Sequence, residues 1–120
     1  MIMEVFKEFT FDAAHYLPHV PEDHKCRRMH GHTYRVRVVV KGPLDPKLGW
    51  VKDFGVLKML VQPIVKQLDH YTLNDIEGLE NPTAENLALW IWRKLEPDLP
   101  ELAEIWVFET PMSACVYRGE

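Results

Sequence analysis

Three histidines stand at positions from which their side chains could share one metal ion. His30 and His32 are separated by one residue, and side chains at i and i+2 project from the same face of a strand. His15 ends an earlier stretch of alternating apolar residues and falls on its apolar side. If the two stretches pair as an antiparallel hairpin, His15 meets the other histidines across the sheet. Three nitrogen ligands and one open position are typical of catalytic zinc, whereas the alternative is surface or hydrogen-bonded core histidines.

Cys26 stands among three cationic neighbours, Lys25, Arg27 and Arg28. Positive charge favours the thiolate, which is the form that acts as a base or nucleophile. The same cations could hold a phosphate group of a substrate. The alternative is an idle thiol in a solvated loop. The other cysteine of the chain, Cys115, lies inside an expected strand, and we assign it a structural role.

Asp69 and His70 place a carboxylate next to an imidazole where the first expected helix closes. Such a pair can act as an oriented general base or acid. Side chains of adjacent residues rarely hydrogen-bond to each other in a regular element, so the sequence does not establish that these two groups meet.

Glu109 continues the apolar alternation of Ile105 and Val107, so its carboxylate is expected to face inward at the end of a strand. An unpaired carboxylate is costly there, and a ligand that offers two parallel N–H donors would satisfy it. The edge of a guanine-like or pterin-like ring offers such a pair. The alternative is that Glu109 pairs with Arg118 or caps a turn.

The elements that must position these residues are predicted from hydrophobic periodicity and turn signals. In chain order they are a strand over Val5–His15, a strand over His30–Lys41, a short strand over Trp50–Phe54 whose Asp53 caps the next element, a helix over Val56–Leu68 kinked at Pro63, a helix from Thr83 to Pro97, and strands over Ile105–Glu109 and Ala114–Arg118. This order favours an α+β fold with an antiparallel sheet and both helices on one face. Apolar side chains such as Trp106 and Phe108 on the other face favour cover by partner subunits in a homo-oligomer.

Composition bounds the remaining possibilities. A chain of 120 residues with 47% hydrophobic and 27% charged residues predicts a single folded domain over 1–120. A net charge of −4 argues against nucleic acid or an anionic membrane as a partner. Two cysteines are too few for a disulfide framework, and neither a leader nor a membrane span is recognisable, so we expect a cytoplasmic protein.

Taken in order along the chain, these motifs resemble the 6-pyruvoyltetrahydropterin synthase family, and the resemblance covers nearly the whole sequence. The matching segments are Phe11-Asp12-Ala13-Ala14-His15, Cys26-Arg27-Arg28-Met29-His30-Gly31-His32, Asp53-Phe54 with Leu57-Lys58, Leu68-Asp69-His70 with Leu73-Asn74, Asn81-Pro82-Thr83-Ala84-Glu85-Asn86-Leu87-Ala88, and Glu109-Thr110. The three residues between Cys26 and His30, and the ending Tyr117–Glu120, are similar to the branch that serves queuosine biosynthesis, a tRNA modification pathway.

The resemblance implies the tunnelling fold, in which four antiparallel strands and two helices form a subunit. Such subunits assemble into trimers, whose sheets form a β-barrel, and then into hexamers with active sites between subunits. By the same resemblance one Zn²⁺ per chain is bound by His15, His30 and His32, Cys26 is the catalytic base, Asp69 and His70 assist proton transfer, and Glu109 anchors the pterin ring.

The implied activity is that of a carbon–carbon lyase acting on a small pterin triphosphate. It would convert 7,8-dihydroneopterin triphosphate to 6-carboxy-5,6,7,8-tetrahydropterin and release acetaldehyde and triphosphate. One alternative is the pyruvoyl reaction of the same fold, which eliminates triphosphate and keeps the side chain. The other is a non-catalytic assembly module, in which Cys26 completes a closed zinc site with the three histidines.

Overall fold

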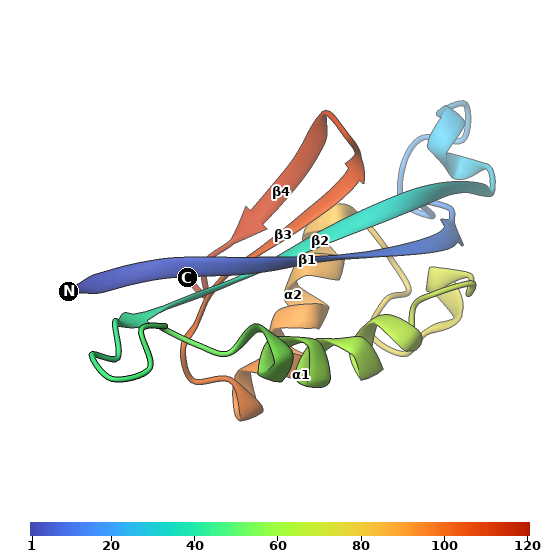
Figure 1. Ribbon diagram of the computed structural model, residues 1–120. Coiled ribbons are helices and arrows are strands. Elements are labelled where there is room, and N and C mark those ends of the chain that lie inside the picture. The colour runs from blue at the N-terminus through green and yellow to red at the C-terminus, as the bar shows by residue number, and fades with distance from the viewer.

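The computed structural model describes all residues, 1–120, and is built on one antiparallel sheet (Figure 1). Two long strands, β1 (Ile2–His15) and β2 (His30–Pro43), form a hairpin, and β3 (Leu102–Thr110) and β4 (Ser113–Tyr117) continue the sheet in the order β1-β2-β3-β4. The β1–β2 ladder pairs Ile2 with Pro43 at one end and His15 with His30 at the other. The predicted four-stranded antiparallel α+β fold is thereby confirmed.

Two α-helices, α1 (Phe54–Lys66) and α2 (Ala84–Leu95), lie on one side of the sheet. The first contacts β1, and the second contacts β3 and β4. Short 3-10 turns, η1 (Lys25–Arg27), η2 (Leu73–Asp75) and η3 (Glu96–Asp98), complete the connections. Both helices therefore cover the same face, as the order of elements predicts.

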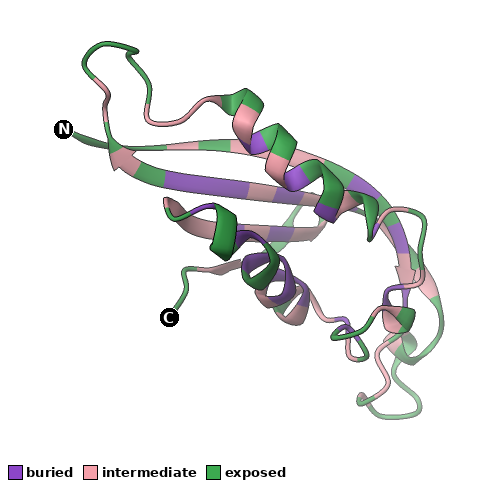
Figure 2. Cartoon of the chain, turned by 90° about the horizontal axis from the view of Figure 1, so that it is seen from below, coloured by how far each residue is buried: buried purple, intermediate pink, exposed green.

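The core lies between this face and the helices, where Figure 2 shows the buried residues. Successive side chains of a strand point to opposite faces, so alternate residues of β2 (Tyr34, Val36 and Val38) are fully buried. The same alternation places Phe11, Ala13 and His15 of β1 on the buried face. The histidine that ends β1 is consequently an extension of the core rather than a surface residue.

Side-chain caps define where the helices begin. The Asp53 carboxylate accepts a hydrogen bond from the Gly55 N–H at 2.8 Å, and Thr83 Oγ1 accepts one from the Asn86 N–H at 3.1 Å. The predicted Asp53 cap is confirmed. The first helix continues through Pro63 as a single element, as expected, and Pro63 is exposed on its outer side.

The predicted short strand over Trp50–Phe54 is wrong. This segment has no partner strand, and Phe54 already belongs to α1 because Asp53 caps that helix. A turn stabilised by Asp45, which accepts backbone hydrogen bonds from Lys47 and Leu48, holds the segment instead. Val51 of this segment packs against the core as a partly buried residue and does not pair in the sheet.

The sheet face opposite the helices carries stacked cations and aromatic rings. The Arg37 guanidinium lies 4.5 Å from the centre of the Phe6 ring and 5.1 Å from that of Trp106, and its Nε donates to Glu8 at 2.8 Å. Phe6 remains 49% exposed. No helix of this chain covers that face, and none is long and apolar enough to span a bilayer.

Candidate active site

The β1–β2 register brings the three predicted metal ligands together. His15 lies directly opposite His30, and His32 is two residues further along the same face of β2. The ring centres of His15 are 4.6 Å from His30 and 5.1 Å from His32, and those of His30 and His32 are 5.0 Å apart. One ligand nitrogen of each ring lies within 4.8 Å of the others. These distances suit one shared metal ion.

Backbone carbonyls orient two of these rings. His15 Nδ1 lies 2.8 Å from the Pro82 carbonyl, and His30 Nδ1 lies 2.7 Å from the Arg28 carbonyl. A carbonyl can only accept, so each Nδ1 carries the proton and each Nε2 keeps a free lone pair. This tautomer presents Nε2 as a ligand, and a partner on the other ring nitrogen is typical of metal-bound histidine.

His15 Nε2 is buried and has no hydrogen-bond partner. An unsatisfied buried polar atom costs about 1–3 kcal/mol, so its presence points to a ligand outside the chain. The nearest charged group is Glu109, whose Oε1 lies 3.4 Å from His15 Nε2 and 3.9 Å from His32 Nε2. A divalent cation fits this donor set because it would engage the free lone pairs and offset the carboxylate charge.

The electrostatic environment favours the neutral form of two of the three histidines. Burial lowers the pKa of His15, and the hydrogen bond to Pro82 and the charge of Glu109 oppose this only in part. Burial also lowers the pKa of His32, with Glu109 acting in the opposite direction. Neutral imidazole is the form that binds metals, so both shifts prepare the site for a ligand near neutral pH.

Cys26 lies beside the histidines although it belongs to a different element. It is in the middle of η1, and its carbonyl accepts a hydrogen bond from the Leu17 N–H at 2.8 Å, which ties the turn to the residues just after β1. The thiol lines a cavity of about 540 Å³ together with His30, His32 and Glu109. Cys26 is not among the ligand atoms that lie within 4.8 Å of one another.

Glu109 faces the histidine cluster, as its strand alternation predicts. The alternative pairing with Arg118 is wrong, because Arg118 Nε donates to Glu104 at 2.7 Å instead. Glu104 also accepts from Trp106 Nε1, and these contacts lower the pKa of its carboxyl. The carboxylate of Glu109 is thereby left without an arginine partner.

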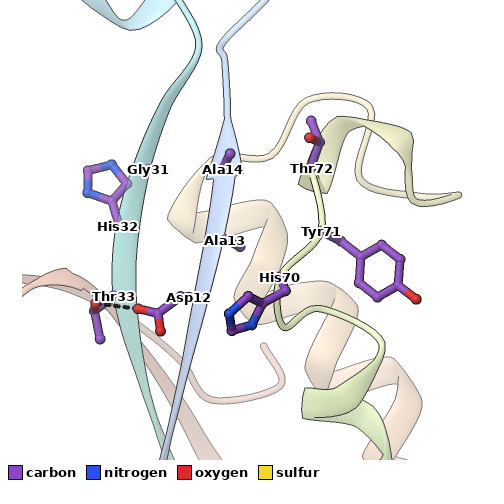
Figure 3. A pocket seen from close by; sticks show the side chains of 9 residues that line it. All are labelled: Asp12, Ala13, Ala14, Gly31, His32, Thr33, His70, Tyr71 and Thr72. Carbon is purple, nitrogen blue, oxygen red and sulfur yellow. Dashed lines mark hydrogen bonds between the residues drawn. The ribbon is translucent and has the colours of Figure 1, made fainter.

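Asp69 and His70 lie away from Cys26, at the free edge of β1. The His70 N–H donates to the Asp12 carbonyl, and the Asp12 N–H donates to Asp69 Oδ1 at 2.9 Å. Figure 3 shows His70 beside β1 and His32 beside β2, with both strands between them. The structure therefore does not bring this pair to the thiol of the same chain.

Within the pair, the two side chains do meet. His70 Nδ1 lies 3.0 Å from Asp69 Oδ1. The contact is possible because the pair lies beyond the helix and His70 has a positive φ of 66°, a conformation outside regular elements. The pKa of Asp69 is lowered, first by the Asp12 N–H and then by His70, so the carboxylate stays ionised and orients the imidazole.

Sequence reasoning missed Asp12 and Thr33 as part of this second cluster. The Asp12 carboxylate accepts a hydrogen bond from the Thr33 hydroxyl and lies close to Asp69 and His70, in a pocket of about 520 Å³ (Figure 3). Their position on the polar side of two paired strands was visible in the sequence. The meeting of this cluster with residues 69–70 depends on the return of the chain to the edge of β1. No local sequence pattern predicts that return.

A small α+β domain gathers three histidines that could share a metal ion, a thiol and a carboxylate without an arginine partner at one end of its sheet, which is an arrangement typical of an enzyme active site. Comparison with known proteins names the family. The sequence profile of 6-pyruvoyl tetrahydropterin synthase matches residues 4–120. The chain belongs to this family and is an enzyme, which confirms the resemblance seen in its motifs.

Individual relatives agree with this assignment. A Synechocystis protein named 6-carboxy-5,6,7,8-tetrahydropterin synthase is 49% identical over 94% of this chain and 91% of its own length. A Pyrococcus furiosus protein named dihydroneopterin monophosphate aldolase is 44% identical over 76% of this chain and 73% of its own length. The solved structure of Caenorhabditis elegans 6-pyruvoyl tetrahydropterin synthase superposes with a TM-score of 0.92 at 28% identity, covering 100% of this chain and 97% of that one.

The lowered histidine pKa values predict acid sensitivity of the metal-free protein. Above the ordinary pKa of 6.5, His15 and His32 are neutral in the folded and the unfolded chain. Below it, the unfolded chain binds protons that the folded sites do not, so the free energy of unfolding falls as pH decreases. The slope is at most about 1.4 kcal/mol per pH unit for each such proton.

Urea unfolding between about pH 7.5 and about pH 5.5 measures this slope. His15→Gln should reduce it, whereas His19→Gln should not, because His19 is exposed. An equal slope in the parent and in His15→Gln would contradict the assignment of the effect to burial of His15.

Proposed function

We propose that the protein is a zinc-dependent lyase of the queuosine branch of its family. It would convert 7,8-dihydroneopterin triphosphate and one water molecule to 6-carboxy-5,6,7,8-tetrahydropterin, acetaldehyde and triphosphate. The observation that carries the proposal is the cavity where Cys26 and Glu109 meet the three-histidine cluster. The 49% identity to a protein named for this product supports the choice of branch.

The histidine cluster fits zinc better than a hard cation. All three donors are imidazole nitrogens, which suit Zn²⁺, whereas Mg²⁺ and Ca²⁺ prefer oxygen ligands. His15, His30 and His32 would hold the ion and leave a coordination position open. When bound, zinc supplies Lewis-acid polarisation of the substrate hydroxyl groups and stabilises the negative charge that develops on them.

Glu109 is proposed to bind the pterin ring. A carboxylate can accept two parallel N–H bonds, and the edge of a pterin presents such a pair. Since Arg118 is occupied by Glu104, no arginine of the chain competes for Glu109. Binding of the ring at Glu109 would direct its side chain toward the thiol and the histidines that line the same cavity.

Cys26 is proposed to remove the carbon-bound proton of the side chain. Its thiol is half-buried and lines the cavity, as a base that contacts substrate must. Cys115 is unsuited to this role: its Sγ lies 3.4 Å from the Ala84 carbonyl, and burial raises the pKa of its thiol.

Asp69 and His70 are proposed to act across a subunit boundary. They lie at the edge of β1, away from the thiol of their own chain, with the imidazole 78% exposed. Asp69 holds the proton on His70 Nδ1, which leaves Nε2 to exchange a proton with a neighbouring molecule. Trimers that close the sheets into a barrel, and hexamers built from them, would bring this edge to a neighbour's cavity and cover the exposed sheet face.

The closed structural zinc module is the less favoured alternative. It requires Cys26 as a fourth ligand, and the thiol does not lie within the 4.8 Å cluster of ligand atoms. The pyruvoyl reaction remains an alternative of the same site, since the Caenorhabditis elegans neighbour carries that name.

Product analysis of the zinc-loaded protein tests the proposed reaction. With 7,8-dihydroneopterin triphosphate, mass spectrometry should detect acetaldehyde and a 6-carboxy pterin in equal amounts. A pyruvoyl product would replace the proposed reaction with the alternative one. Absence of turnover with one zinc bound per chain would refute the substrate assignment.

Replacement of the thiol separates catalysis from structure. Cys26→Ala should keep the zinc content and the melting temperature of the parent and lower turnover about 10²–10⁴-fold, the usual contribution of a positioned acid or base. Cys115→Ala is the matched control and should keep turnover. Release of zinc and a lower melting temperature in Cys26→Ala would favour the closed module instead.

Complementation between two inactive variants tests the shared site. Cys26→Ala and His70→Asn should each be inactive alone, because each lacks one half of the machinery. After subunit exchange at equal amounts, about one quarter of the sites would combine an intact thiol with an intact imidazole from another chain. Mixed oligomers that remain inactive would place both groups in one chain.

A further inference from the structure

The chain just beyond the end of β1 is held by a side chain instead of a strand. The β1–β2 ladder ends at the pairing of His15 with His30, so Tyr16 has no partner residue in the sheet. Asn74 Oδ1 accepts a hydrogen bond from the Tyr16 N–H at 3.0 Å, and Asn74 Nδ2 donates to the Tyr16 carbonyl at 2.8 Å. One amide group therefore satisfies both backbone polar groups of Tyr16, as a paired strand would.

Asn74 can hold this segment because its own turn, η2, is anchored in the core. Its neighbour Leu73 is fully buried, and Thr72 forms a parallel β-bridge with Ala14. Asn74 Nδ2 also lies 3.4 Å from the Glu80 carbonyl, so the amide nitrogen has two carbonyl acceptors. These contacts fix the orientation of the amide, since a flipped group would set its oxygen against both carbonyls.

The residue after Tyr16 connects this contact to the turn that carries the thiol. The Leu17 N–H donates to the Cys26 carbonyl at 2.8 Å, whereas the other hydrogen bonds of η1 stay within residues 20–28. Leu17 and Cys26 also line the same cavity. The Asn74 amide is thus one residue away from the hydrogen bond that joins η1 to the end of β1.

We propose that Asn74 is a positioning residue that holds η1 against the end of β1 and so places the Cys26 thiol. This role rests on the proposed function, in which Cys26 removes the carbon-bound proton of the substrate. Asn74 itself does not line the cavity, so it acts through Tyr16 and Leu17. A misplacement of about 1 Å can cost about 100-fold in rate, so a contact outside the cavity can control the proton transfer inside it.

Turnover and isotope effects of the zinc-loaded protein test this role. Asn74→Ala should lower kcat about 10- to 100-fold at unchanged zinc content, because the thiol is no longer held at its distance from the substrate. Deuterium on the side-chain carbon from which Cys26 removes the proton should then slow kcat, because proton removal limits the rate.

Asp45→Ala is the matched control for this experiment. Asp45 also accepts two backbone hydrogen bonds, from Lys47 and Leu48, but it lies beyond the other end of the β1–β2 pair. The control variant should therefore keep the kcat of the parent. If Asn74→Ala melts at a lower temperature than the control, Asn74→Asp replaces it. That variant keeps an acceptor for the Tyr16 N–H and loses only the donor, so the same changes should follow with smaller factors.

Amide hydrogen exchange and thiol alkylation measure the tether without turnover. In Asn74→Ala the Leu17 N–H should lose protection about tenfold, while the Val36 N–H in the middle of β2 should keep it. Alkylation of Cys26 by iodoacetamide, measured on a Cys115→Ala background, should become faster because the half-buried thiol is exposed more often.

Three outcomes would overturn the role of Asn74. The first is a parental kcat in Asn74→Ala, and the second is a fall in kcat without the isotope effect. The third is loss of zinc, which would place the effect at His15, the residue before Tyr16. If the parent protein does not turn over the pterin triphosphate, the proposed function fails, and exchange and alkylation decide. Faster exchange at Leu17 together with faster alkylation of Cys26 supports the tether, and any other result refutes it.

Discussion

The candidate site depends on one constraint, the register of the β1–β2 hairpin. Pairing of His15 with His30 places both imidazoles, and that of His32, on the face that also buries Phe11 and Tyr34. A slip of one residue would turn His15 to the opposite face, because side chains alternate along a strand. The apolar side chains that fix the core therefore also fix the site, and the energy of burial maintains its geometry.

The β1–β2 pair also positions a second set of residues, which lie on its other face and along the edge of β1. Asp12 precedes His15 by three positions, so its side chain points away from the histidines while its backbone groups bind residues 69 and 70. His15 itself is fully buried with an unsatisfied nitrogen, an arrangement that lowers stability unless a ligand is present. Without a ligand, the protein is therefore less stable than it would be if His15 Nε2 had a hydrogen-bond partner.

Alternation and helical periodicity predicted the sheet, both helices and the meeting of the three histidines, because each depends on local patterns repeated over many residues. The short strand at Trp50–Phe54 was wrong because the preceding turn leads into the Asp53 cap of α1 and not into a strand that returns to the sheet. The Asp69–His70 contact was not foreseen because it depends on the positive φ of His70. No local pattern could place this pair relative to Cys26, because the segments that carry them are far apart in the sequence.

The residues with proposed functional roles divide between two kinds of backbone. The histidines are on long paired strands, where any displacement breaks a ladder of hydrogen bonds. Cys26 is on a connection between the strands, which is tied to the end of β1 by the hydrogen bond from the Leu17 N–H to the Cys26 carbonyl. Under the proposed function, exchanges within that connection would alter which side chain reacts without disturbing the sheet. Such a division would allow the reaction to change during evolution while the sheet stays the same. Two relatives with different names, one a synthase and the other an aldolase, are 49% and 44% identical to this chain.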